Sequence, residues 1–474
     1  MHAAQSEQSE TQIVKTQKLK MSEKLTFGIG DFGANYSWTF IASFLTIYMT
    51  DTVGISAGII GTIILISRVT DGFTDLFMGT LIDNTNSKMG KAKPWVFWTA
   101  PILGLLTFLL FNVPGALDQT GKIIYIFIIY LLISAVFYTA NNVAYSSLTS
   151  LMTNDKNDRV SLGSIRFIFS QLAVLSITTF TTFFVSGFGG GQQGWTITTI
   201  IYAFLCAVPL MITGWFVKER NIAKRKTENN TTQRVPFFLI MKVLLTNKYF
   251  IITIVLYLLW YLRQTDNGIR VYYATYVFNN ADIMAILSLA TTVPTIIGLM
   301  YTPKFVEKFG IRRSIVIGLI ISIISYLIMT VFSENLTLLT IGLIVNAIGV
   351  VPFTGALSAI VADVGDLIYW KSGVPVQGSV FSLTSAGMKI GSGLQGAIVG
   401  WTLTIGGYVA GSSIQPDSSI LAMKSMQIYF PFACIIIIML VTFTLNYEKF
   451  IPSVKKEIQE GKVGENRTKN LVKL

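Results

Sequence analysis

The chain has 474 residues, of which 52% are hydrophobic and 13% are charged, and its mean hydropathy is +0.60. Soluble domains carry about 25% charged residues, so this composition excludes an ordinary soluble protein and indicates an integral membrane protein. The formal net charge of +12 would suit a nucleic-acid partner, but the cations cluster in short segments beside apolar runs, which is typical of membrane topology.

Apolar runs close to the roughly 20 residues needed to cross a bilayer recur along the whole chain. They predict an all-α membrane protein with twelve transmembrane helices, arranged as two six-helix halves. The runs lie near 28–50, 56–82, 95–113, 123–147, 162–186, 195–217, 249–277, 283–302, 314–332, 337–360, 378–408 and 425–446.

The distribution of cations predicts the orientation in the membrane. Lysines and arginines precede the first run, follow the second and fourth runs, and fill the segment 218–248, whereas the alternate loops carry almost only Lys122 and Lys424. The positive-inside rule predicts that both termini are cytoplasmic, and we expect a multi-pass protein of the plasma membrane.

Two similar segments suggest that the chain is built twice. "GTLIDNTNSKMGKAKPW" (79–95) and "MYTPKFVEKFGIRRSIV" (300–316) each follow the second run of a half and place cations just after a glycine. Two halves around a central site are the plan of a secondary transporter, although any short cytoplasmic turn also favours glycine and cations. The predicted parts are a cytoplasmic segment 1–25, a half 26–217, a linker 218–248, a half 249–447 and a tail 448–474.

The same two segments predict a cytoplasmic gate, formed by charge contacts that close the inner face when the carrier opens outward. Its candidate residues are Gly79, Asp83, Gly90, Lys91 and Lys93 in the first half, and Glu307, Gly310, Arg312 and Arg313 in the second.

The second run contains three charged residues, Arg68, Asp71 and Asp75. Asp71 and Asp75 are four residues apart and share one helix face, with Arg68 on the same side. Two stacked carboxylates repel, and an arriving Na⁺ or a shared proton relieves the repulsion, so we predict a cation site to which Thr74 and Thr139 add hydroxyl ligands. The alternative is that Arg68 neutralises one aspartate while the other caps a helix end.

Two further runs carry polar and aromatic groups that suit a sugar. "FYTANNVAYSSL" (137–148) contains Asn142 and Tyr145, and "GDFGANYSW" (30–38) contains Asn35 and Trp38 at helical spacing. Amides bond hydroxyl groups and aromatic rings pack against an apolar sugar face, so these four residues are candidate substrate contacts. Polar packing between helices is the alternative for either segment alone.

Charges in the second half extend this pattern. Lys389 lies deep in the eleventh run, where a lysine seeks a carboxylate from another helix, and Asp71 or Asp75 is the expected partner. Snorkelling to the membrane surface is the alternative. In "LRQTDNGIR", Arg263 and Asp266 are expected to form a local ion pair, which leaves Arg270 over.

Other kinds of site are excluded by what the sequence lacks. The only histidine is His2, and the two cysteines, Cys206 and Cys434, lie in different apolar runs where core packing is expected. We therefore expect no metal site and no cofactor apart from a coupling ion, H⁺ or Na⁺. An enzyme is not expected, because the loops are short and histidine-free.

Several segments together resemble the glycoside–pentoside–hexuronide:cation symporters, the major facilitator branch of the melibiose permease. The resemblance runs from about residue 24 to residue 448. It implies the major facilitator fold and sugar uptake driven by Na⁺ or H⁺; by position it matches Asp71, Asp75 and Thr139 to the family's cation site and Arg166 and Lys389 to its sugar site. The segments that carry it are "GDFGANYSW", "YMTDTVGISAGIIGTIILISRVTDGFTDLFMG", "GKAKPW", "DRVSLGSIR" and "VADVGDLIYWKSG…GSVFSLTSAGMKIGSG".

The departures from that family pattern bear on the substrate. Where the melibiose permease has sugar-binding aspartates, this chain has Asn35 and Asn142, and Thr74 replaces the amide of the cation motif. The pattern resembles the xyloside and isoprimeverose carriers of the family, which implies a neutral glycoside as substrate. The expected partners are thus a small sugar or glycoside, a coupling cation and the lipid bilayer; the alternative function is a lysolipid or other amphiphile carrier on the same fold.

Overall fold

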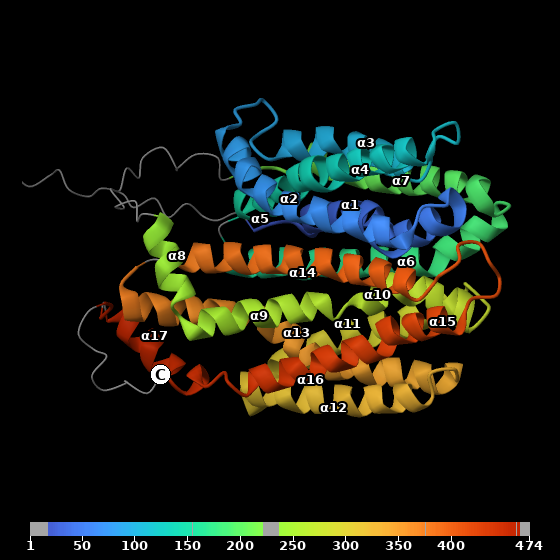
Figure 1. Cartoon of the computed structure of the whole chain (residues 1–474). Helices are drawn as coiled ribbons and strands as arrows, with labels where there is room; N and C mark the ends of the chain where they lie inside the picture. The colour runs from blue at the N-terminus through green and yellow to red at the C-terminus, as the bar shows by residue number, and fades with distance from the viewer. Residues whose placement is uncertain (1–17, 154, 221–236, 375, 461, 465–474) are drawn as a thin grey trace, which may run out of the picture.

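The computed structural model describes residues 18–153, 155–220, 237–374, 376–460 and 462–464. Within these ranges every regular element is a helix, apart from an isolated bridge between Ser87 and Gly90. Figure 1 shows the long helices running roughly alongside one another. The predicted all-α class is confirmed.

The elements fall into two consecutive sets. The first comprises α1 (Met21–Ile47), η1 (Tyr48–Val53), α2 (Ala57–Asn84), α3 (Lys93–Leu110), α4 (Gln119–Leu131), η2 (Leu132–Tyr138), α5 (Thr139–Met152), α6 (Lys156–Gly187) and α7 (Gly191–Phe216). The second comprises α8 (Phe237–Leu245), α9 (Lys248–Leu262), α10 (Thr265–Tyr272), η3 (Tyr273–Val277), α11 (Ile283–Phe309), α12 (Ile311–Val331), α13 (Leu336–Ser372), α14 (Gln377–Ile405), α15 (Asp417–Lys424), η4 (Ser425–Tyr429), α16 (Phe430–Thr442), η5 (Tyr447–Lys449) and α17 (Ile451–Gln459).

Twelve long segments of the described chain correspond to the twelve predicted runs when consecutive helical pieces are joined. Eight of them are long and apolar enough to cross a membrane, and a ninth is added if Leu239–Leu245 and Lys248–Val277, bent by 79°, form one span. The other three are α1, α2 and α14, which carry several polar residues of the predicted sites, among them Asn35, Asp71 and Lys389. Some helices are longer than the apolar runs that predicted them. The run 337–360 predicted an end near residue 360, but α13 continues to Ser372. An apolar run marks only the part of a helix that lies in the hydrocarbon, and the helix can continue beyond it.

Local chemistry fixes where several helices begin. The side chains of Asp118, Asn247 and Asn335 accept hydrogen bonds from the first free N–H groups of α4, α9 and α13, which such caps satisfy. Pro94 lies in the first turn of α3, where its missing N–H costs nothing. These caps give the loops short, defined paths between spans.

Most described helices pack on others of their own set, and the two sets meet mainly where α2 contacts α14, α6 contacts α11 and α1 contacts α10. Figure 1 shows α14 along this seam. Glycines permit the closest approach: a Cβ at Gly400 would lie 2.2 Å from the Ala57 carbonyl oxygen, and one at Gly61 would lie 3.0 Å from Ala397. Residues 221–236 of the predicted linker 218–248 lie outside the described residues, and the boundary between halves stays a prediction.

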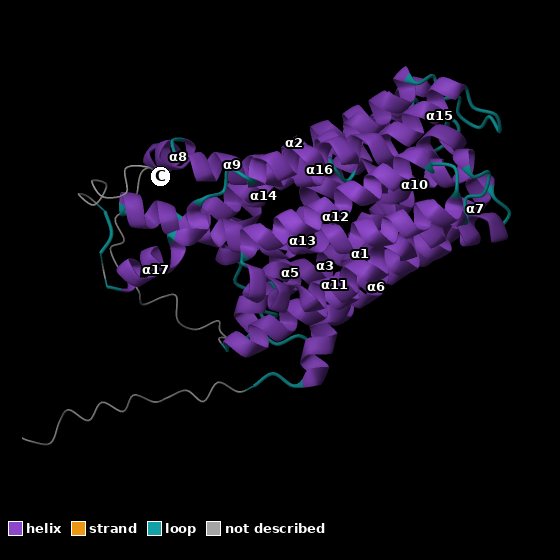
Figure 2. Ribbon diagram, turned by 90° about the horizontal axis from the view of Figure 1, so that it is seen from below, coloured by secondary structure: helices purple, strands orange, loops and turns teal. Residues whose placement is uncertain are grey.

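The bundle has two distinct ends. Figure 2 shows α8 and α17 at one end and α15 at the other. We call the first the Gly90 end, after the turn that follows α2, and the second the Asp51 end, after the acid in η1. A buried aromatic cluster of Phe40, Phe111 and Trp195 holds α1, α3 and α7 together on the way to the Asp51 end.

Candidate functional site

A cavity of about 440 Å³ lies between the two sets of helices. Its lining comes from α1, α2, α4, η2, α5 and α6 on one side and α9, α10, α11 and α14 on the other. Charged side chains among the described lining residues are Arg68, Asp71, Asp75, Arg270 and Lys389. The cavity therefore joins the predicted cation-site acids to charges from the second set.

Lys389 of α14 bridges the two aspartates of α2. Its Nζ lies 3.1 Å from Asp71 Oδ1 and pairs closely with Asp75 Oδ2. The Asp71 side chain is only 3% exposed, whereas 31% of the Asp75 side chain is exposed. The expected partnership between Lys389 and these acids is present, and the ammonium occupies the position between carboxylates that a cation would take.

Arg68 supports Asp71 from one turn earlier in α2. Its Nη1 lies 3.3 Å from Asp71 Oδ2, and its guanidinium lies 3.5 Å from the centre of the Trp38 ring. Cation–aromatic contacts of this kind strengthen where water is excluded, and Arg68 is 8% exposed. Asp71 is thus shared between two cations, while Asp75 has Lys389 alone among its described charge partners.

The two predicted hydroxyl ligands are placed differently. Thr139 donates to Asp71 Oδ1 and lines the cavity. Thr74 donates instead to the Asp71 carbonyl oxygen, 3.1 Å away on its own helix, and is not among the lining residues. The structure therefore brings Thr139 to the acid pair and leaves Thr74 outside the cavity.

A second polar network is built around Asp31 of α1. Arg166 Nε lies 2.9 Å from Asp31 Oδ1, and its other nitrogens donate to Ser146 Oγ at 3.2 Å and to Asn142 Oδ1 at 3.4 Å. Asn35 donates to the Asp31 carbonyl oxygen at 2.8 Å. Of these residues Asn142 lines the cavity, so it is the point where the network reaches the cavity. The sequence did not predict the pairing of Asp31 with Arg166.

The two aromatic candidates for substrate contact, Trp38 and Tyr145, lie in different places. Trp38 lines the cavity and packs on Tyr138, with ring centres 4.6 Å apart. Tyr145 is 1% exposed, stacks on Phe27 and donates to the Phe27 carbonyl oxygen at 2.5 Å. In this conformation Trp38 can meet a ligand, and Tyr145 lies in the core of the first set.

The second set contributes a different pairing from the one expected. Asp266 pairs with Arg270, whose Nη2 lies 2.9 Å from Oδ2, and Arg263 donates to the Tyr326 hydroxyl at 3.1 Å. The expected local pair of Arg263 with Asp266 is therefore wrong, because the turn at Gln264 between α9 and α10 changes the helical spacing. The same side of the cavity presents the amides of Asn267, Gln264 and Gln395, which the sequence did not single out.

The predicted gate residues of the first half form a capped turn. Glu219 accepts hydrogen bonds from the backbone N–H groups of Lys91, Ala92 and Lys93 at 2.8 to 2.9 Å. Gly90 has a φ of +119°, and a Cβ there would lie 2.6 Å from the carboxylate. Lys93 donates to the Trp215 carbonyl oxygen at 3.1 Å, so this contact stays within the first set.

The second half repeats the arrangement. Glu448 accepts from the N–H groups of Ile311 and Arg312 at 2.6 and 3.1 Å, beside Gly310 with a φ of +79°. The Arg312 side chain donates to Asn446 Oδ1 at 2.9 Å and to the Phe443 carbonyl oxygen at 2.7 Å. Both glutamates went unnoticed in the sequence; a signal was present, since each follows the last span of its half.

The structure gives less support for the remaining predicted gate residues. Glu307 and Arg313 have exposed side chains, and Gly79 has open space around it. The side chain of Asp83 lies outside the described residues. Contacts of the gate between the two halves thus stay a prediction.

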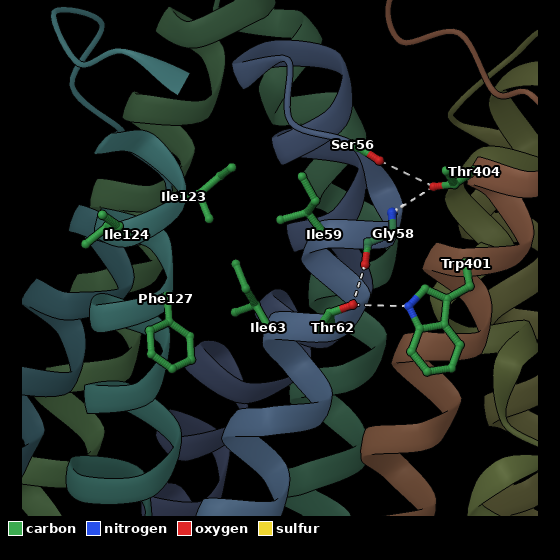
Figure 3. A pocket seen from close by; sticks show the side chains of 10 residues that line it. All are labelled: Ser56, Gly58, Ile59, Thr62, Ile63, Ile123, Ile124, Phe127, Trp401 and Thr404. Atoms are coloured by element: carbon green, nitrogen blue, oxygen red, sulfur yellow. Dashed lines mark hydrogen bonds between the residues drawn. The ribbon is translucent and has the colours of Figure 1, made fainter. Parts of the chain in front are cut away.

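A second hollow of about 570 Å³ lies on the outside of the bundle between α2, α4 and α14 (Figure 3). Isoleucines and Phe127 line one side, while Thr404 accepts from the Gly58 N–H at 2.8 Å and Trp401 donates to Thr62 Oγ1 at 3.1 Å. Its ten lining residues include no acid or base. It offers nothing to hold a cation, and its hydrogen bonds fasten α2 to α14.

Comparisons with known proteins cover nearly the whole chain. A family profile described as MFS/sugar transport protein matches residues 26–449. The isoprimeverose transporter of Lactiplantibacillus pentosus is 27% identical over 462 residues, which cover 96% of this chain and 94% of that one. The symporter YjmB of Bacillus subtilis (strain 168), described as uncharacterized, is 30% identical over 424 residues, covering 88% and 90%.

A solved structure gives a matching fold. The crystal structure of the nucleoside transporter NupG superposes with a TM-score of 0.64 at 16% identity, covering 90% of this chain and 100% of that one. At this identity the likeness concerns the arrangement of helices alone.

Proposed function

The chain belongs to the MFS/sugar transport protein family, as one of its glycoside–pentoside–hexuronide:cation symporters, and on this premise we propose that it imports a neutral glycoside together with a proton. It is a multi-pass membrane transporter and not an enzyme. The proposed substrates are xylosides and isoprimeverose-like disaccharides, and likeness to an isoprimeverose transporter supports this class.

One observation carries the proposal: Lys389 of the second set lies between Asp71 and Asp75 of the first. The ammonium balances the repulsion between two stacked carboxylates. A cation that binds the aspartates competes with Lys389 and loosens this bond between the sets. Ion binding and the relative movement of the sets are then coupled through the same pair of acids.

The choice of a proton rests on the ligands near the acids. Small hard cations take several oxygen ligands. Of the two predicted hydroxyl ligands, Thr139 reaches Asp71, whereas the Thr74 hydroxyl bonds its own helix. A proton needs one carboxylate oxygen. Asp75 is the better acceptor, because it is the more exposed of the two and has fewer partners.

The choice of a neutral sugar rests on the two candidate arginines. Arg166 pairs with Asp31, and Arg270 pairs with Asp266. A substrate carboxylate would have to displace one of these aspartates to gain a paired guanidinium. Sugar hydroxyls need only the amides of Asn142, Asn267 and Gln395 and the ring of Trp38, all of which line the cavity.

The same lining argues against an amphiphile as substrate. An acyl chain would leave the buried charges of Arg68, Asp71 and Lys389 facing hydrocarbon, which is costly. We further propose that the Gly90 end is cytoplasmic, as the cations of the turns predict, and that the helices before and after the linker act as two moving halves.

Competition for uptake tests the substrate class. Cells or vesicles that carry the protein take up a labelled xyloside in the presence of unlabelled xylosides, isoprimeverose, glucuronides or lysolipid. Xylosides and isoprimeverose should block uptake. Stronger inhibition by glucuronides that is lost in Arg270→Gln, or inhibition by lysolipid alone, would contradict the proposed substrate.

A further inference from the structure

Asp51 lies in η1, which continues α1, and bonds residues of the opposite set. The Tyr276 hydroxyl of η3 donates to Asp51 Oδ2 at 2.6 Å, and the Tyr408 hydroxyl, just after α14, donates to Oδ1. Thr50 donates to the same Oδ1 at 2.8 Å. Each carboxylate oxygen therefore receives a hydroxyl from the second set, although 225 and 357 residues separate the partners in sequence.

The cluster is closed by contacts among its members. The hydroxyls of Tyr408 and Tyr276 are 2.9 Å apart, and Tyr272 bonds Thr50 at 2.9 Å. The ring centres of Tyr272 and Tyr276 lie 5.3 and 5.5 Å from that of Tyr408. Gly54, with a φ of +83°, ends η1 and turns the chain toward α2, which holds Asp51 at the seam.

The chemistry makes these bonds directional. Hydrogen bonds to an ionised carboxylate are shorter and stronger than neutral ones. A tyrosine hydroxyl keeps its proton at neutral pH, so Tyr276 and Tyr408 both remain donors to Asp51. Asp51 accordingly accepts from both sets without needing a cation.

The two ends of the bundle are fastened in different ways. At the Asp51 end the bonds of Asp51 to Tyr276 and Tyr408 run between the sets, and so do those of Thr404 and Trp401 to α2 (Figure 3). At the Gly90 end Lys24 pairs with Asp158 at 2.8 Å, and Lys455 pairs with Asp363 at 2.8 Å, each within its own set. The described structure is thus tied across the seam at the Asp51 end.

We propose that Asp51, Tyr276 and Tyr408 form the latch of the outer gate, which holds the outer face shut and must break each time a sugar enters from outside. The inference rests on the proposed function, in which the Gly90 end is cytoplasmic and the Asp51 end therefore faces outward. In an alternating-access carrier such a latch sets the fraction of molecules whose site is open to the outside. Weakening it raises that fraction without touching the sugar or cation site.

The test measures access to the cavity from outside and needs no substrate. Thr46, on α1, lines the cavity, and Thr46→Cys in a background with Cys206→Ser and Cys434→Ser is labelled on intact cells by a membrane-impermeant maleimide. Tyr408→Phe, Tyr276→Phe and Asp51→Asn should each speed labelling about tenfold, the effect of losing one charge-assisted hydrogen bond. Combining Asp51→Asn with Tyr408→Phe should give little further increase, because both remove the same bond.

Tyr48→Phe is the matched control. Tyr48 is a buried tyrosine at the same end, but its hydroxyl donates to Gln192 at 2.9 Å within the first set, so labelling should not change. Thermal unfolding in detergent checks that each variant is folded. Unchanged labelling in the folded Tyr408→Phe and Tyr276→Phe variants, an equal increase in Tyr48→Phe, or a double variant that multiplies the single effects would overturn the latch. A failed sugar assignment would leave the labelling result intact.

Discussion

Replacing the two aspartates of α2 one at a time should separate their structural roles while abolishing coupling in both variants. Asp71 is 2% exposed and shared by Arg68, Lys389 and Thr139. Asp71→Asn leaves the buried Arg68 without its carboxylate, and removing one partner of a buried ion pair costs about 3–5 kcal/mol. Asp75→Asn breaks a pair whose acid is 31% exposed, so solvent screening limits the loss to about 1 kcal/mol or less.

Thermal unfolding of the purified variants in detergent measures this difference. Asp71→Asn should lower the unfolding midpoint clearly more than Asp75→Asn, and adding Arg68→Gln to Asp71→Asn should recover part of the loss. In vesicles both single variants should lose accumulation against a gradient and keep sugar exchange. Equal midpoints for the two variants, or accumulation at the parental level in either, would refute the assignment of Asp71 and Asp75.

The other predictions concern single contacts. Asn142→Ala should raise the KM for the glycoside about tenfold, since one hydroxyl partner is lost, and an unchanged KM in uptake assays would exclude Asn142 from the site. Glu219→Gln and Glu448→Gln should each cost about 0.5–2 kcal/mol in thermal unfolding, because each weakens a helix cap, while proton-driven uptake per folded molecule stays the same; a loss of coupling would make these glutamates more than caps. Neutralising Lys91 and Arg312 together should speed labelling of a cysteine in the cavity from the cytoplasmic side, and unchanged labelling would leave them as topology signals.

Much of the architecture could be predicted because hydrophobic runs report directly on membrane spans. The twelve runs correspond to the twelve long helical segments, and the spacing of Arg68, Asp71 and Asp75 correctly placed them on one face of α2. The partnership with Lys389 followed from the cost of a lone charge in hydrocarbon. The sequence was enough where the membrane environment of one residue, such as Lys389, already implied the kind of partner it must have.

Predictions from the sequence were less complete where the answer depended on tertiary partners. The break at Gln264 reassigned Asp266 from Arg263 to Arg270, and nothing in an apolar pattern marks such a turn. The sequence did not single out Asp51, because its tyrosine partners are 225 and 357 residues away and only the fold brings them to it. The inward position of Trp38 and the core position of Tyr145 likewise depend on how the helices are rotated against one another.

The most direct test of the account is uptake of isoprimeverose and a methyl xyloside by proteoliposomes under separately imposed proton and Na⁺ gradients. The account predicts accumulation under an inward proton gradient without Na⁺, and none in the Asp75→Asn variant. Accumulation that required Na⁺ at equal pH would contradict coupling to protons. The absence of accumulation under either gradient would contradict cation-coupled import of these sugars.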